Sequence, residues 1–258
     1  MSIGCALELQ KSAPARDIAL CSSCRLSGTC FPQGLDTDDV QKLEPLVRRF
    51  RPIHRGEHVF RTGDKFQNIY AVRSGTVKVY RLSADFEEQI IGFYLPGEVL
   101  GFNSIEQGEY VCSAVALETS SFCAFPFSLL EELCRCIPAL QHQVFRLMSK
   151  EIVFSNEMMM SHCGKDARQK VAIFLISLSN RYQHQGYSAR EFRLTMSRRE
   201  VGIYLGLALE TVSRTLSRMQ EDNLITVDRK SVIIHDLPAL QQVCTGLGPD
   251  VIPLIPVN

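Results

Sequence analysis

Three cysteines near the N-terminus have the residue type and spacing that suit a metal centre. Cys21, Cys24 and Cys30 are separated by two and then by five residues, and the residues between them are mostly small. Thiolates are the usual ligands of zinc and of iron–sulfur clusters, and small residues let a loop wrap around such a centre. A fourth ligand must come from elsewhere in the chain. The spacing therefore predicts a thiol-based site and leaves a cluster, structural zinc and a thiol–disulfide switch open.

The composition indicates a two-domain protein that works in a reducing compartment. The chain has 258 residues, ten of them cysteine, and 45% of its residues are hydrophobic. We find no signal-peptide pattern and no apolar run of transmembrane length, so we expect a cytoplasmic protein with reduced thiols and no membrane association. Ser-His-Asp, Walker-type and HExxH arrangements are not recognisable. We therefore expect that the protein is not an enzyme.

Charge is distributed unevenly along the chain. The net charge is zero overall, but residues 165–236 contain 12 Lys or Arg against 8 Asp or Glu, a net charge of +4. This mild excess permits nucleic-acid binding by the C-terminal part without requiring it.

A long uninterrupted helix is predicted over residues 137–163. One apolar stripe follows the spacing of a short coiled coil and predicts a homodimer interface. A second stripe, formed by Leu140, Val144, Leu147, Phe154 and Met158, can pack on the protein's own core. The alternative is a core helix that is buried on all sides. The residues of the predicted interface are Phe145, Met148, Ile152, Ser155 and Met159.

Residues 197–235 have the pattern of a winged helix-turn-helix. Ser197 and Glu200 form a capping box, a glycine turn follows at Gly206, and a second helix is predicted over 208–221. Two short strands, 224–227 and 231–235, would form the wing. The exposed face of the second helix carries Glu210 and Arg214, which can bind cytosine and guanine edges in the major groove. The alternative is an amphipathic helix with a solvated charged face.

Short alternating runs broken by glycine occupy residues 51–127. This pattern is typical of an antiparallel sandwich or barrel. The predicted strands are 57–61, 69–72, 76–82, 89–94 and 112–117.

Three motifs in this region resemble the β-roll of the cyclic-nucleotide-binding regulator superfamily. They are FRTGD at 60–64, YAVRSGTVKVY at 70–80 and LPGEVLG at 95–101. In nucleotide-binding members of that superfamily, a Glu and an Arg hold the ribose and the cyclic phosphate. The matching positions here are Phe102 and Cys112, so the charged phosphate partner is missing. We therefore expect no cyclic nucleotide.

The chain more closely resembles the FNR-type branch, whose sensor is an oxygen-labile iron–sulfur cluster. In that branch one cysteine in an Ala-Leu-Glu-Thr…Cys…Pro-Phe segment completes the ligand set, and this chain reads ALETSSFCAFPF at 116–127. The resemblance implies a [4Fe–4S] cluster on Cys21, Cys24, Cys30 and Cys123. It also implies that the cluster promotes homodimerisation and DNA binding, that oxygen reverses both, and that RNA polymerase is the protein partner of an activator.

The segment LETVSR at 209–214 closely matches the recognition helix of that family. By resemblance, Glu210, Ser213 and Arg214 read the bases of a TTGAT-N4-ATCAA-like palindrome. Candidates for phosphate contacts are Arg198, Thr211 and Arg218.

Two residues depart from the family pattern. Arg25 follows the second cysteine, where a small residue is usual, and a cation there should alter the redox properties of an anionic cluster. Ser155 replaces an acidic residue on the dimer helix. Because serine opposes pairing less than a carboxylate does, we expect the cluster-free protein to dimerise more readily than its relatives.

The predicted fold class is α+β, with a β-roll, a long dimerisation helix and a winged helix-turn-helix. A cluster-binding segment, 1–36, precedes the sensor domain, 37–136, which begins with a short helix at 37–49 capped by Thr37. The dimer helix follows at 137–164 and the DNA-binding domain at 165–236. Residues 237–258 are predicted to be a partly disordered tail.

Overall fold

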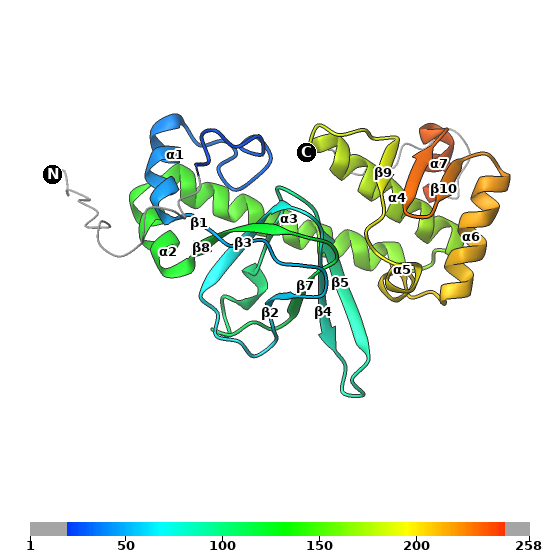
Figure 1. The fold of residues 1–258 in the computed structure, drawn as a ribbon, viewed down its shortest axis with the longest axis horizontal. Helices are drawn as coiled ribbons and strands as arrows, with labels where there is room; N and C mark the ends of the chain where they lie inside the picture. Colours follow the sequence, from blue (N-terminus) through cyan, green and yellow to red (C-terminus); the bar gives the residue numbers. More distant parts are fainter. Residues whose placement is uncertain (1–19, 246–258) are drawn as a thin grey trace. The chain divides into compact units, whose positions relative to one another are not determined.

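The computed structural model describes residues 20–245. Contacts divide the chain into two compact units, one formed by Met1–Arg81 with Phe93–Glu151 and the other by Leu82–Gly92 with Ile152–Asn258. The predicted α+β architecture is confirmed, and Figure 1 shows its elements along the chain. The domain boundaries drawn from the sequence stay a prediction, because the long helix belongs to both units.

The β-roll consists of two four-stranded antiparallel sheets. Their strand orders are β1-β8-β3-β6 and β2-β7-β4-β5. All five strands predicted from the sequence are present within two residues at each end. The strands are β1 (Arg48–Arg49), β2 (His58–Phe60), β3 (Asn68–Ser74), β4 (Val77–Leu82), β5 (Glu88–Tyr94), β6 (Val99–Leu100), β7 (Ser113–Ala116) and β8 (Ser121–Pro126).

The first sheet is covered on both faces. Along β8, Phe122 and Ala124 belong to one core together with the stacked rings of Phe60 and Tyr110, whose centroids are 3.9 Å apart. Phe125 and Cys123 belong to, or pack against, a second core that lies against the other face. A strand that is buried on both faces has no polar alternation, and for this reason the sequence pattern does not reveal β8.

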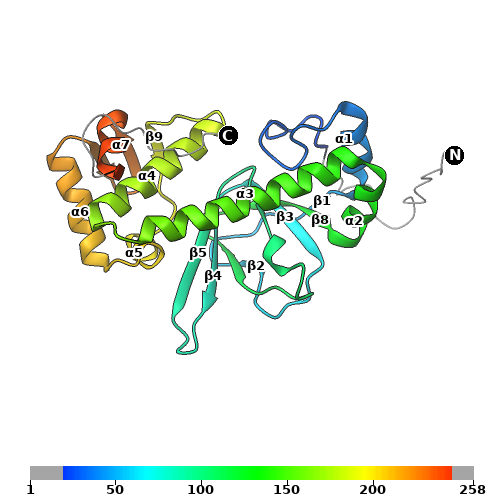
Figure 2. The same ribbon diagram turned by 180° about the vertical axis from the view of Figure 1, so that it is seen from behind.

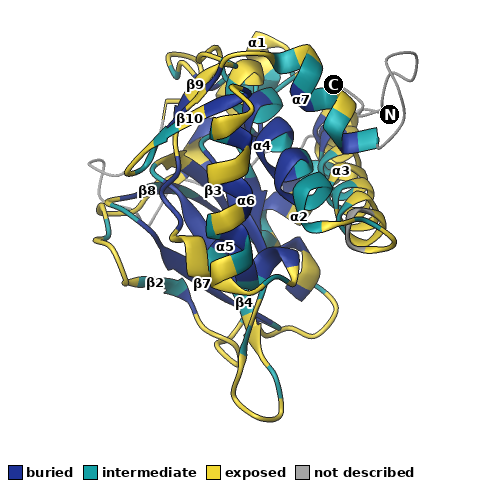
Figure 3. Cartoon of the chain, turned by 90° about the vertical axis from the view of Figure 1, so that its right-hand side faces the viewer, coloured by how far each residue is buried: buried dark blue, intermediate teal, exposed yellow. Residues whose placement is uncertain are grey.

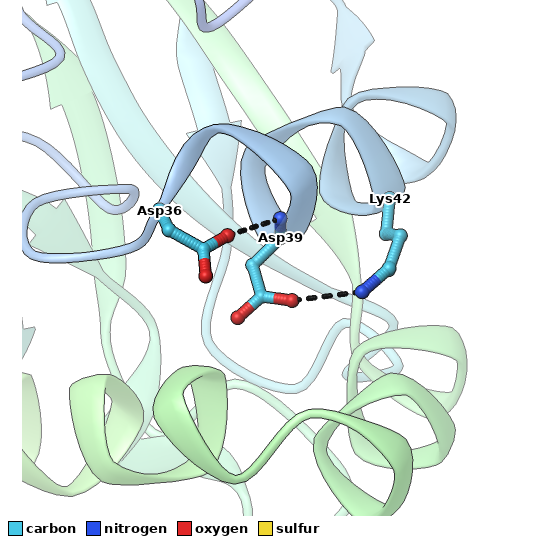
Figure 4. Close-up of polar contacts among 3 residues, drawn as sticks. All are labelled: Asp36, Asp39 and Lys42. Carbon is cyan, nitrogen blue, oxygen red and sulfur yellow. Dashed lines mark hydrogen bonds and ion pairs between the residues drawn. The ribbon is translucent and has the colours of Figure 1, made fainter.

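The first helix, α1 (Thr37–Leu43), is shorter than predicted. Its N-cap is Asp36, not Thr37: the Asp36 carboxylate accepts a hydrogen bond of 2.8 Å from the amide of Asp39 (Figure 4). Lys42 in turn forms an ion pair of 3.0 Å with Asp39. The helix gives way to a 3₁₀ turn, η1 (Glu44–Leu46), because Pro45 has no backbone N–H with which to continue the α-helical hydrogen bonding.

Two helices follow the β-roll. The first is α2 (Phe127–Cys136), which begins directly where β8 ends. The predicted long helix is α3 (Pro138–His162), which is continuous in Figure 2 and begins at a proline, a favourable residue for a first helical turn.

The C-terminal unit contains the predicted helix-turn-helix. It is built from α4 (Ala167–His184), α5 (Arg198–Leu205), α6 (Leu209–Glu221) and a three-stranded sheet with the order β10-β11-β9. The strands are β9 (Glu191–Arg193), β10 (Ile225–Asp228) and β11 (Ser231–Ile234), so β9 pairs with β11 and adds a third strand to the predicted two-stranded wing.

The first nine residues of the predicted tail form a helix, α7 (Leu237–Thr245), which buries Leu240 and Cys244. The carboxylate of Asp236 caps this helix by accepting from the amide of Ala239. Residues 246–258 lie outside the described residues, as do residues 1–19 of the predicted N-terminal segment.

Candidate metal centre and DNA interface

A series of tight turns brings the three N-terminal cysteines together. The amide of Cys24 donates to the carbonyl of Cys21, and the amide of Cys30 donates to the carbonyl of Leu26. Leu26 and Phe31 are buried, and Phe31 stacks on Phe125 of β8 at 4.4 Å between ring centroids. These apolar contacts fix the cysteine loop against the first sheet.

A buried carboxylate also anchors the loop. Both the amide and the hydroxyl of Ser22 donate to Glu44, at 2.8 and 2.7 Å. Glu44 is buried at the end of α1, so the loop is tied to the element that follows it.

Cys123 lies on β8, against the same core as the loop. That core contains Cys21 and Phe31, with Cys30 and Cys123 packed against it. The structure thus brings Cys123 to the same core as Cys21 and Cys30, although it lies more than ninety residues further along the chain.

The electrostatics of the thiols show the same proximity. Burial, together with the nearby Cys123, Glu44 and Cys24, raises the pKa of Cys21 to about 12. Burial likewise raises the pKa of Cys30 to about 12, with further contributions from Cys123, Cys21 and Cys24. The pKa of Cys123 is raised by burial and then by Cys24. Each of the four thiols therefore lies within electrostatic range of the other three.

The donor set suits a soft, thiolate-bound centre. Among the described residues, no group of three or more His, Cys, Asp or Glu side chains is placed to hold a single metal ion as it stands. An iron–sulfur core is larger than one ion and holds its four cysteines further apart than tetrahedral zinc does. Four converging thiols on a loop and a strand therefore fit a cluster by donor chemistry.

Cys112 is separate from this site. It is buried in the other core, inside the β-roll, where the Asn103 amide donates to its sulfur at 3.4 Å. Nearby, Tyr94 donates a hydrogen bond to Glu151, and both residues border the same small space as Phe102 and Cys112. In this chain the region matching a cyclic-phosphate cassette is thus lined by a thiol, an aromatic ring and a carboxylate.

The helix-turn-helix is shaped by local sequence signals. Ser197 accepts from the amide of Glu200, and Glu200 accepts from the amide of Ser197, so the predicted capping box is present. Gly206 ends α5 in the left-handed conformation, with φ of +63°. On α6, one face is buried and the other exposed (Figure 3). The buried side chains are Val212, Thr215, Leu216 and Met219.

The predicted DNA-contacting residues lie on the opposite face of α6 or at the start of α5. Glu210, Arg214 and Arg218 are exposed, and Thr211 and Ser213 are half-buried. Arg198 is exposed in the first turn of α5. Two further cations lie at the turn of the wing: Arg229 is exposed, and Lys230 donates a hydrogen bond of 3.1 Å to the carbonyl of Thr195.

The two apolar stripes of α3 have different environments. Leu140 is buried, and Val144 and Leu147 pack against the core that contains the cysteine loop. On the predicted dimer stripe, Phe145 is 59% exposed, Ile152 60% and Met159 64%. Met148 is half-buried and packs against the loop core, while Ser155 is exposed. The alternative of a helix buried on all sides is therefore wrong for this chain.

Together, a β-roll, a long helix with an exposed apolar stripe and a winged helix-turn-helix define a DNA-binding regulator. Family models agree: residues 50–135 match a cyclic nucleotide-binding domain and residues 169–243 match a Crp-like helix-turn-helix domain. Among the described residues, no helix combines the length and apolarity needed to cross a membrane.

Similar proteins define the family. The chain is 45% identical over 222 residues to the transcriptional activator protein Anr of Pseudomonas protegens, covering 86% of this chain and 91% of Anr. It is 41% identical over 227 residues to electron transport regulator A of Shewanella oneidensis (88% and 91%), and 40% identical over 229 residues to the fumarate and nitrate reduction regulatory protein of Yersinia pestis (89% and 92%). The solved structure of FixK2 from Bradyrhizobium japonicum has a TM-score of 0.70 at 27% identity, covering 76% of this chain and 96% of FixK2. The chain belongs to the CRP/FNR superfamily and, within it, to the FNR/Anr family of DNA-binding transcriptional activators.

Proposed function

We propose that this protein is an oxygen-responsive, homodimeric transcription activator whose sensor is a [4Fe–4S] cluster on Cys21, Cys24, Cys30 and Cys123. The observation that carries the proposal is that Cys21, Cys30 and Cys123 come from a loop and a strand onto one core, with Cys24 close enough to raise the pKa of Cys21 and Cys30. When bound, the cluster supplies an oxygen-labile link between the loop and the sheet. This proposal also places the protein in the cytoplasm, where thiols stay reduced.

The shared core offers a route from the cysteine loop to the dimer helix. Phe31 of the loop and Leu140 of α3 are buried in the same core, and Val144, Leu147 and Met148 pack against it. A loop held by four ligands would fix this side of α3. The exposed stripe of Phe145, Ile152, Ser155 and Met159 would then pair with a second copy, because pairing removes large apolar side chains from water.

Dimerisation would create the DNA-reading surface. Two copies of α6 about 34 Å apart, one DNA turn, match a palindrome such as TTGAT-N4-ATCAA. Glu210, Ser213 and Arg214 would contact base edges, and Arg198, Thr211 and Arg218 would contact phosphates. Loss of the cluster would weaken pairing and release DNA. By family resemblance, RNA polymerase is the protein partner.

We further propose that cyclic nucleotide is not the signal, although the β-roll matches that domain family. Cys112 takes the position of the phosphate-binding arginine, and the Glu151 carboxylate borders the same space. A carboxylate there would repel a cyclic phosphate.

The test is an anaerobic purification with a matched pair of variants. Wild-type protein and Cys112→Ser should show iron–sulfur absorbance, with about four iron and four sulfide per chain. Cys123→Ser should lose most of its iron and sulfide, because Cys123 packs against the core that contains the cysteine loop, whereas Cys112 lies in the other core. A colourless protein that contains zinc would instead support a zinc site. A reversible disulfide among these cysteines, without iron, would support a thiol–disulfide switch. Equal cluster content in Cys123→Ser and Cys112→Ser would refute the ligand set.

A further inference from the structure

The strand register places an arginine directly beside the fourth cysteine. On β1, Arg49 is paired with Cys123 of β8, and Arg48 is paired with Ala124. Directly paired residues in an antiparallel sheet project from the same face, with Cβ atoms about 5 Å apart. Arg49 therefore shares a face with Cys123, whereas Arg48 projects from the opposite face.

A second arginine lies on the strand at the other side of Cys123. On β3, Ala71 is paired with Cys123, and Arg73 follows two residues later, where the register shifts between Val72 and Ser74. Strand order β1-β8-β3 thus puts Cys123 between a strand carrying Arg49 and a strand carrying Arg73.

Both arginines lie on the strands that flank β8, next to the position of Cys123 in the register. Positive charges at these two positions would act on a thiolate-bound centre at Cys123. Since both side chains are exposed, their effect should be moderate and sensitive to salt.

We propose that Arg49 and Arg73 are charge-balancing residues that bracket the cysteine centre and set its redox properties. The inference rests on the proposed cluster function and deepens it. Four thiolates bring more negative charge than an iron–sulfur core neutralises, so the bound centre is a net anion, and net charge near a cluster is one of the terms that set its potential. Reduction of the centre at an electrode adds one more negative charge. Two flanking cations stabilise this more negative, reduced form and so raise its midpoint potential.

The experiment measures the midpoint potential of the anaerobically assembled centre for Arg49→Gln, Arg73→Gln, Arg49→Lys and the matched control Arg48→Gln. At a fixed potential, Arg49→Gln and Arg73→Gln should each lower the ratio of reduced to oxidised centre by about three- to tenfold, as expected for the loss of one nearby exposed charge. Arg49→Lys keeps the positive charge, so its midpoint potential should lie close to that of wild type. Added salt should narrow the difference in midpoint potential between Arg49→Gln and wild type.

The control and the cluster content separate the possible failures. Arg48→Gln should leave the potential unchanged, because Arg48 projects from the opposite face. If Arg48→Gln shifts the potential as much as Arg49→Gln, or if Arg49→Lys behaves like Arg49→Gln, the charge-balancing role is wrong although the cluster stands. If wild-type protein assembles no cluster, the proposed function itself fails.

Discussion

Gly202 lies inside α5, where the backbone of the following turn comes very close. A β-carbon built at this position would stand 2.6 Å from the carbonyl oxygen of Leu207. Glycine therefore lets the two helices of the DNA-binding motif meet at their turn. A glycine inside a helical pattern is the sequence signal for such a close approach.

We expect Gly202→Ala to lower the free energy of unfolding by about 1–3 kcal/mol, because the backbone contact cannot move away as a flexible side chain could. Chemical denaturation followed by circular dichroism measures the change. The control is Ser217→Ala, at an exposed position of α6, which should be neutral or slightly stabilising. Equal unfolding midpoints for Gly202→Ala and wild type would show that the turn can relax at no cost.

Base and phosphate contacts should respond differently to substitution. Arg214→Ala should weaken binding to the palindrome by about 1–3 kcal/mol and relax preference at one base position. Arg198→Ala should weaken binding to all duplexes similarly and reduce the salt dependence. Fluorescence anisotropy with the palindrome and single-base variants distinguishes the two. Uniform weakening by Arg214→Ala would rule it out as a base-reading residue.

At the residue scale, the sequence reveals ligands that are close together in the chain more readily than those brought together by folding. Cys21, Cys24 and Cys30 are recognisable from spacing alone. Cys123 enters only through resemblance, because strand pairing rather than local pattern carries it to the loop. The pairing of Arg49 with Cys123 is likewise set by strand register and not by a local pattern.

At the scale of elements, the exposed stripe of α3 gives the clearest prediction. Ile152→Glu should raise the dimer dissociation constant about a hundredfold or more, because it would bury a charge without a partner. The matched control is Val153→Glu, which makes the same kind of change at an exposed apolar residue about 100° around the helix. Sedimentation velocity of the anaerobic protein measures the change. Equal effects from both variants would place the interface elsewhere.

Ser155 allows a second test of the same helix. We expect cluster-free wild-type protein to contain a detectable dimer fraction at micromolar concentration, and Ser155→Asp to shift it toward monomer by placing two carboxylates near each other across the seam. Analytical ultracentrifugation of both proteins, with Ser155→Ala as control, gives the comparison. Strictly monomeric cluster-free wild type would contradict the prediction.

Elements with a distinct period or cap were predictable, and elements without one were not. The alternating strands and α6 follow their patterns, whereas β8 is buried on both faces and β1 and β6 have two residues each. The end of α1 depends on Pro45, and α7 depends on a cap at Asp236 followed by Pro238 in its first turn. Pro45, Asp236 and Pro238 are visible in the sequence, but the same residue types are also common in loops and tails, so they do not by themselves predict a helix boundary.

At the scale of the whole molecule, the proposed mechanism couples the four thiols to DNA binding through one helix, α3. The sequence could indicate a sensor, a helix and a DNA reader separately. Their coupling depends on the core shared by the cysteine loop and α3, which only the folded structure displays. Coupling of this kind requires that the cluster-bound and cluster-free forms differ in dimer stability.

The most direct test is the dissociation constant for a labelled TTGAT-N4-ATCAA duplex, measured by anisotropy on one anaerobic sample before and after air. We expect the constant to rise by about tenfold or more as the visible absorbance disappears, and to recover when the cluster is rebuilt anaerobically. An unchanged dissociation constant after complete loss of the absorbance would contradict the account.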